Sequence, residues 1–120
     1  MDGVQMGVMI CADAYTENVT ASLATQGAEI LIVSSFWGPG LYGPNGEWEQ
    51  RSLDTGLPIF VCNRTGEDAT VSFWKAESSV IQNGKKLLSY SSRQSSILVF
   101  EWDVENMELL STTFQVEIIR

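Results

Sequence analysis

The stretch from Gly7 to Phe36 reads GVMICADAYTENVTASLATQGAEILIVSSF and decides the fold. It opens with an apolar run, residues 8–10, that is typical of a buried strand. Residues 16–26 then have helix-compatible spacing, with Gly27 in the place of a C-terminal cap. A second apolar run, residues 30–33, follows at once. Strand, helix and strand within about thirty residues predict a parallel βαβ unit, because a parallel pair needs a crossover of about this size.

Cys11 stands directly after the first apolar run, at the carboxyl end of a predicted strand and just before a predicted helix. Ligands of open α/β sheets usually bind at this edge. The unpaired N–H groups of a helix N-terminus favour a thiolate, and the backbone N–H of Ala12 can point at a developing oxyanion. This arrangement suits acyl transfer from an amide or nitrile carbon through a thioester or thioimidate. Cys11 is therefore the candidate nucleophile and Ala12 the candidate oxyanion donor; the alternative for Cys11 is a thiol packed in the core.

A segment rich in glycine and proline, residues 34–46 (SSFWGPGLYGPNG), follows the second predicted strand. Its composition excludes regular structure, so we expect a loop over the same sheet edge as Cys11. Phe36 and Trp37 are candidate substrate-binding residues, because this loop would bring them beside the thiol. The alternative is that both rings pack beneath the loop.

The segment after this loop predicts a second helix, over residues 46–55. Asn45 offers an N-cap and Gly56 can end the helix. The helix would bury Trp48 and Leu53 against the sheet.

The remaining chain predicts strands. Residues 59–62 form an apolar run that is expected to be the next buried strand, with Cys62 in the core. The dipeptide Asn83-Gly84 favours a type I′ hairpin turn between two apolar runs. Two further strands are expected over residues 97–102 and 107–119.

Composition limits the classes of function. With 120 residues and 44% hydrophobic content, the chain is long enough for one folded domain. Its net charge is −8, it has no histidine, and its basic residues do not cluster beyond Lys85-Lys86, so nucleic acid is not an expected partner. No apolar run approaches about 18 residues and the first residues do not resemble a signal peptide. We therefore expect no membrane partner and a cytoplasmic protein with reduced thiols.

Several stretches resemble the nitrilase superfamily of carbon-nitrogen hydrolases. CADAYTE followed by GAEILIVSS is similar to the region around the nucleophile of that superfamily, and WEQRSLDTGLPIFVCNRTG is similar to a later helix and strand. SSVIQNGKKLL and ILVFEWD are similar to the strands after these, so the resemblance runs from about residue 7 to residue 103. The matched positions are Cys11, Asp13, Tyr15, Glu17, Trp48, Arg51, Asp54, Asn63, Arg64 and Gly66.

The resemblance implies an α/β fold that is half of an αββα four-layer sandwich, with a mixed sheet and two helices on one face. Residues 1–120 would then be a single partial carbon-nitrogen hydrolase domain, its C-terminal portion. The implied activity is that of a nitrilase-like amidohydrolase acting on non-peptide C–N bonds of small amides or nitriles through a thioester at Cys11. Neither a cofactor nor a metal ion is expected.

Two of the three catalytic groups of the superfamily, a Glu and a Lys, precede the nucleophile and have no counterpart here. Asp2 is the one charged residue ahead of Cys11, and the first lysine is Lys75. Proton transfer and oxyanion stabilisation need such groups, so we expect the chain to be inactive alone. Its expected partners are a missing N-terminal half or a second copy. The alternative function is a non-catalytic dimerising module built on the half-fold. A small flavodoxin-like binder or thiol redox protein has less support, since G-x-G-x-x-G, P-loop and C-x-x-C motifs are absent.

Other matched residues are expected to have structural roles: Asp13, Glu17, Arg51, Asp54, Asn63 and Gly66. Asp13 would be an N-cap, and Glu17 would act on the first turn of the helix or in an ion pair. Arg51 and Asp54, three apart on a helix, would form a surface pair. The last two would be turn residues with backbone roles.

Overall fold

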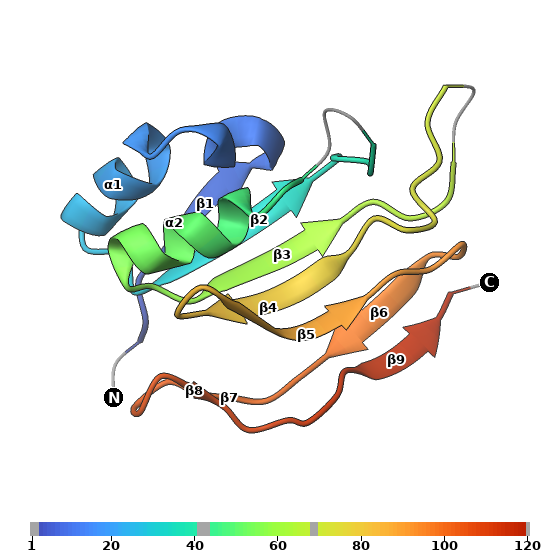
Figure 1. The fold of residues 1–120 in the computed structure, drawn as a ribbon. Helices are drawn as coiled ribbons and strands as arrows, with labels where there is room; N and C mark the ends of the chain where they lie inside the picture. The colour runs from blue at the N-terminus through green and yellow to red at the C-terminus, as the bar shows by residue number, and fades with distance from the viewer. Residues whose placement is uncertain (1–2, 41–43, 68–69, 120) are drawn as a thin grey trace.

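A five-stranded mixed sheet forms the centre of the computed structural model, which describes residues 3–40, 44–67 and 70–119 (Figure 1). Its strands follow one another in the order β1-β2-β3-β4-β5, the first three parallel and the last two antiparallel. They are β1 (Met6–Ile10), β2 (Ile30–Ser35), β3 (Ile59–Asn63), β4 (Ser78–Gln82) and β5 (Lys85–Tyr90). The predicted parallel βαβ unit and mixed sheet are confirmed.

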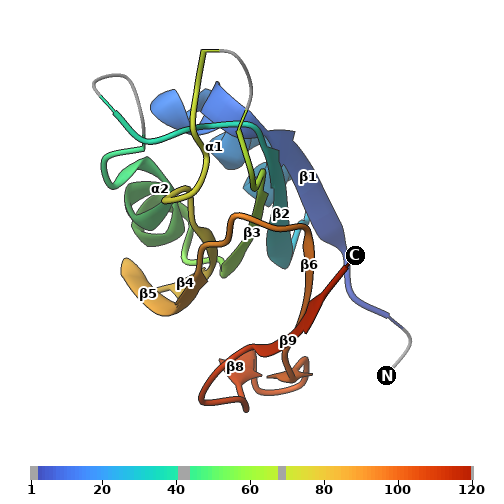
Figure 2. The same ribbon diagram turned by 90° about the vertical axis from the view of Figure 1, so that its right-hand side faces the viewer.

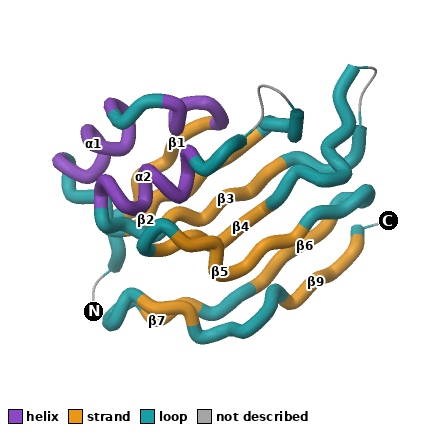
Figure 3. The backbone as a smooth tube through the Cα atoms, viewed as in Figure 1, coloured by secondary structure: helices purple, strands orange, loops and turns teal. Residues whose placement is uncertain are grey.

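Two α-helices cover one face of this sheet, as Figure 3 shows. They are α1 (Asn18–Thr25) and α2 (Glu47–Thr55), and a short 3₁₀ helix, η1 (Cys11–Tyr15), precedes α1. Gly56 ends α2 as predicted, in the left-handed region at φ +72°. The N-cap of α2 is Gly46 and not Asn45, whose backbone N–H donates to the Glu47 carboxylate instead. Within the described ranges, no helix is both long enough and apolar enough to cross a membrane.

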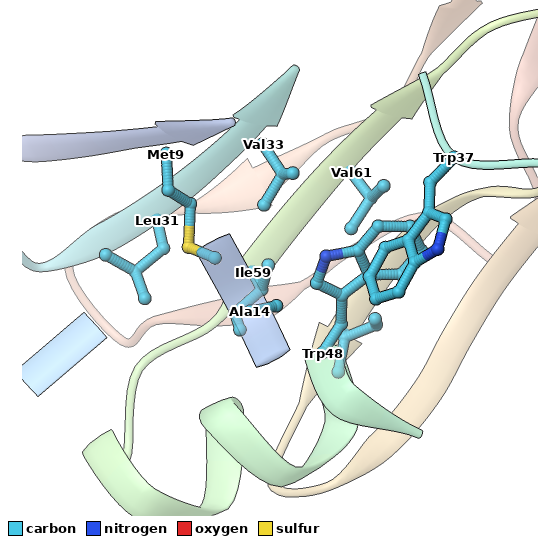
Figure 4. Packing of buried hydrophobic residues seen from close by; sticks show 9 residues of the cluster. Met9, Ala14, Leu31, Val33, Trp37, Trp48, Ile59 and Val61 are labelled. Carbon is cyan, nitrogen blue, oxygen red and sulfur yellow. The ribbon is translucent and has the colours of Figure 1, made fainter. Parts of the chain in front are cut away.

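The core lies between the sheet and the helices (Figure 4). Its buried members are Met9, Ala14, Leu31, Val33, Trp37, Trp48, Ile59, Val61 and Ile81. Within β2 and within β3 these residues are two apart, because alternate side chains of a strand face the same side of the sheet. Trp48 is buried as predicted, but Leu53 is 58% exposed, with its side chain beside Gly84 in the turn between β4 and β5.

The opposite face of the sheet carries the C-terminal segment, which folds as two short antiparallel pairs. β6 (Ser96–Val99) pairs with β9 (Gln115–Ile118), and β7 (Trp102–Asp103) pairs with β8 (Glu108–Leu109). Strands form within both predicted ranges, 97–102 and 107–119, but neither range is one continuous strand. The first is interrupted where Phe100 and Trp102 turn their rings onto Phe60 of β3, at centroid distances of 5.0 and 5.1 Å.

The core can be tested by comparing a buried leucine, Leu31, with an exposed one, Leu110. Leu31 is fully buried between β1 and β3, so Leu31→Ala should lower the free energy of unfolding by about 2–5 kcal/mol through lost burial and a cavity. The matched control Leu110→Ala, at an exposed leucine, should change it by no more than about 0.5 kcal/mol. Urea denaturation followed by circular dichroism measures both. Equal losses in the two variants would contradict the packing.

Candidate functional site

The carboxyl ends of β1, β2 and β3 meet at one edge of the sheet. Ile10 pairs with Ser34, and Ser34 pairs with Cys62. The three parallel strands therefore end next to one another. Cys11 therefore lies at the predicted sheet edge, next to the strand that leads into the Phe36–Trp37 segment.

Cys11 is the first residue of η1 and has a φ of +47°, a left-handed conformation that is uncommon for a residue with a side chain. Its side chain is partly buried against the core. The prediction that an α-helix begins just after it needs correction, since η1 intervenes and α1 begins only at Asn18. The chain thus makes a tight turn at the thiol before the helix starts.

Asp13 holds the start of this turn. Its Oδ2 accepts a hydrogen bond from the backbone N–H of Ile10 at 3.0 Å. The prediction that Asp13 caps a helix needs correction, because it lies inside η1 and not at the N-cap of α1. Glu17 directly precedes α1, where its backbone carbonyl accepts from the Thr20 hydroxyl at 3.1 Å. Ala12 belongs to η1, and the oxyanion role of its backbone N–H stays a prediction.

Phe36 and Trp37 have opposite environments. Phe36 is 60% exposed, whereas Trp37 is 6% exposed. The Trp37 ring contacts Tyr15, the last residue of η1, at a centroid distance of 4.8 Å. It also contacts Trp48 of α2, at 5.2 Å, and Figure 4 shows these two indole rings. Trp37 thus packs in the core beside the turn, and Phe36 is the more accessible of the two candidates.

Arg64 and Phe73 lie against the exposed ring of Phe36. The Arg64 guanidinium is 4.8 Å from the centroid of Phe36 and 4.7 Å from that of Phe73. The two rings are 5.1 Å apart. Such cation–π contacts fix the Phe36 side chain without burying it.

Asn63, at the end of β3, binds the backbone of Trp37 at both of its polar groups. The Trp37 N–H donates to Asn63 Oδ1, and Asn63 Nδ2 donates to the Trp37 carbonyl, both at 3.1 Å. Asn63 is the last residue of β3 and not a turn residue as predicted, and its side chain binds backbone just beyond the end of the neighbouring strand β2. Sequence reasoning missed this partner, and the motif Asn-Arg-x-Gly after an apolar strand was the one signal for it. Gly66 has φ +77°, as a turn glycine should.

The Arg51–Asp54 pair is present as predicted, with Nε and Oδ2 3.1 Å apart. Both side chains are partly buried, so the pair is not purely a surface contact.

A pocket of about 210 Å³ lies beyond Trp37, between the loop after β2, the start of α2 and β4. Its charged lining residues are Glu49, Lys75, Glu77 and Lys86, and the last two form an ion pair. Burial alone raises the pKa of Glu77, but hydrogen bonds from Lys86 and Ser89 and the Lys86 charge outweigh it and hold that pKa below its ordinary value. Among the described residues, no three His, Cys, Asp or Glu side chains are grouped so that they could hold a metal ion.

Cys62 is exposed, and the prediction that it is a core residue is wrong. Its side chain lines a pocket of about 200 Å³ on the sheet face opposite the helices, together with Phe60, Phe100 and Phe114. The sequence of an apolar strand does not show which face of the sheet is fully covered. Cys62 faces the side opposite the helices, which the C-terminal segment covers only in part.

Comparison with known proteins gives one matching family. The sequence profile described as carbon-nitrogen hydrolase matches residues 1–110. A probable nitrilase of Schizosaccharomyces pombe is 24% identical over 114 residues, which make up 92% of this chain and 41% of that protein. The chain therefore spans less than half the length of this curated relative.

Solved structures share the fold over about a third of their length. A carbon-nitrogen hydrolase from Helicobacter pylori is 27% identical with a TM-score of 0.59, covering 72% of this chain and 36% of that one. Nit3 of Saccharomyces cerevisiae, a nitrilase-superfamily member, is 21% identical with a TM-score of 0.63, covering 72% and 33%. An amidase of the same superfamily from Nesterenkonia is 18% identical with a TM-score of 0.62, covering 74% and 34%. The expected nitrilase-like half-fold is confirmed.

The exposure of the two thiols makes their reactivity testable. Iodoacetamide should modify both Cys11 and Cys62 in the native protein, because both side chains are free and neither is fully buried. Intact-mass spectrometry should find two added groups in the native chain and one in Cys62→Ser. A Cys62 thiol that reacts only after denaturant is added would contradict the exposed position.

Proposed function

The chain belongs to the carbon-nitrogen hydrolase family, and from this premise we propose that it carries the nucleophile of a nitrilase-like amidohydrolase acting on non-peptide C–N bonds. The observation that supports Cys11 in this role is its position. It begins a tight turn at the end of a parallel strand, in a left-handed conformation, with its side chain partly accessible. Strained backbone of this kind clusters at functional sites.

The proposed reaction has two covalent steps. The Cys11 thiolate attacks the carbonyl carbon of a primary amide, and the C–N bond breaks to leave a thioester and ammonia. Water then attacks the thioester, which releases a carboxylic acid and restores the thiol. With a nitrile, the same attack gives a thioimidate. The backbone N–H of Ala12 is the proposed donor to the oxyanion of each tetrahedral intermediate.

Two structures of the Nesterenkonia amidase support a cysteine nucleophile in a protein of this fold. In one, acrylamide has added to its active-site cysteine, and in the other the acetamide moiety of fluoroacetamide is bound covalently there. By analogy, small amides of this size are the proposed substrate class for Cys11.

The proton-transfer groups for this chemistry are proposed to come from polypeptide outside these 120 residues. The printed sequence has no histidine, and Lys75 is its first lysine. The curated relative is more than twice as long as the matched region, which leaves room for an additional acid and ammonium group.

A complementation assay tests this division of labour. The purified chain should release no ammonia from acetamide or propionamide above the background of Cys11→Ala. Addition of the separately produced first part of a homologous carbon-nitrogen hydrolase, which carries the Glu and the Lys, should restore ammonia release.

Cys62→Ala is the matched control and should keep the restored activity, because Cys62 lies on the other face of the sheet. Ammonia release that survives Cys11→Ala in the mixture would overturn the proposed nucleophile. Turnover by the unmixed chain would overturn its proposed dependence on added groups.

A second candidate function, a dimerising module, is favoured by the open face of the sheet. Val8, Ile32, Phe60, Val80 and Leu88 pair in one row across the five strands. The C-terminal segment lies on this face of the sheet (Figure 2). Within the row, the exposed fraction of the side chain rises from 0% at Val80 to 63% at Val8. An apolar strip of this kind, continued by Met6 and Ile10, favours association in water.

Sedimentation velocity tests this association. The chain should sediment as a dimer that the double change Val8→Lys and Ile10→Lys converts to a monomer, because the ammonium groups would lose hydration on burial. Leu53→Lys is the matched control, since Leu53 is equally exposed but lies on α2, on the other side of the sheet. A monomeric unmodified chain would rule out the dimerising module.

A further inference from the structure

We propose that Asn63 is a positioning residue that sets the orientation of the Cys11 turn through Trp37. The inference rests on the proposed function for its relevance to catalysis, while its structural part rests on hydrogen bonds from Asn63 to the Trp37 backbone and on ring contacts of Trp37. Asn63 is the last residue of β3 and is not part of η1, so it would act on the Cys11 thiol only indirectly, through Trp37.

The first step of this coupling is the binding of the Trp37 backbone. Asn63 is 7% exposed, and its carboxamide satisfies the N–H and the carbonyl of Trp37 with two hydrogen bonds of 3.1 Å. Trp37 lies two residues beyond Ser35, the last residue of β2. Removing the carboxamide removes both of these hydrogen bonds, which costs free energy and loosens the segment.

The second step of this coupling is the contact between the Trp37 ring and the end of the Cys11 turn. The Trp37 ring packs on Tyr15 at 4.8 Å with an interplanar angle of 59°, and on Trp48 at 5.2 Å and 88°. Tyr15 closes the five-residue η1 that Cys11 opens. The turn is thus held at its beginning by Asp13 and at its end by Tyr15 against Trp37.

The competing interpretation is that Asn63 only stabilises the fold. The same residue offers a matched control for that, because its backbone N–H donates to the buried Ser78 Oγ at 2.9 Å. Ser78→Ala removes this bond and leaves the carboxamide and Trp37 untouched. A purely structural role would make the two kinds of variant alike.

The test compares Asn63→Ala, Asn63→Asp and Ser78→Ala in a Cys62→Ser background. The first readout is the circular-dichroism couplet of the near-perpendicular Trp37–Trp48 pair, and the second is the rate of Cys11 alkylation by iodoacetamide. Asn63→Ala should lose most of the couplet and change the alkylation rate several-fold. Asn63→Asp keeps the acceptor for the Trp37 N–H and should show a smaller change. Ser78→Ala should lower the melting temperature while both readouts stay as in the background protein.

The third readout is ammonia release in the complemented mixture. Asn63→Ala should lower kcat by about 10- to 100-fold with little change in KM, the effect expected when a nucleophile is displaced by about 1 Å. If Asn63→Ala does not fold, Asn63→Asp gives the same comparison. Equal effects of Asn63→Asp and Ser78→Ala on the couplet and on alkylation would overturn the positioning role. Absence of ammonia release from the background mixture, with the couplet and alkylation responding as expected, would overturn the proposed function and support the positioning of the turn.

Discussion

Parallel pairing of β1, β2 and β3 is the constraint on which the rest of the structure depends. Parallel strands all end at the same edge, so three chain reversals must be accommodated there, each with its own backbone groups to satisfy. The chain meets this demand with a tight turn after β1 and with a side-chain clamp between the ends of β2 and β3. The candidate site is thus built from the residues that end these strands.

Much of this fold follows from local pattern. The apolar runs at 8–10 and 30–33, separated by helical spacing, are enough to give the parallel unit, and Asn83-Gly84 gives the hairpin through its two left-handed residues at φ +53° and +76°. The C-terminal strands were less predictable. Their hydrophobic alternation continues through Phe100, but strand pairing stops where the Phe100 ring contacts Phe60 of β3. No local signal in the sequence encodes a partner so distant along the chain.

The candidate site likewise has features that the sequence predicted and features that it did not. The position of Cys11 at a strand end depends on the order of neighbouring elements, so sequence was sufficient to predict it. The 3₁₀ turn depends on the Asp13 carboxylate reaching back to the Ile10 amide, and the Trp37 clamp joins residues 26 positions apart. Contacts like these arise only after the strands have assembled. The predicted burial of Cys62 and Leu53 was wrong for a related reason, since burial depends on which side of an element its neighbours cover.

The left-handed backbone at Cys11 has a consequence for how this sequence can vary. A residue with a β-carbon is disfavoured in that region by about 1–2 kcal/mol relative to glycine. Selection for thermostability alone would therefore favour replacement of Cys11 by glycine. A cysteine retained there is opposed by its own conformational preference, so its persistence among descendants of this chain would record selection for reactivity.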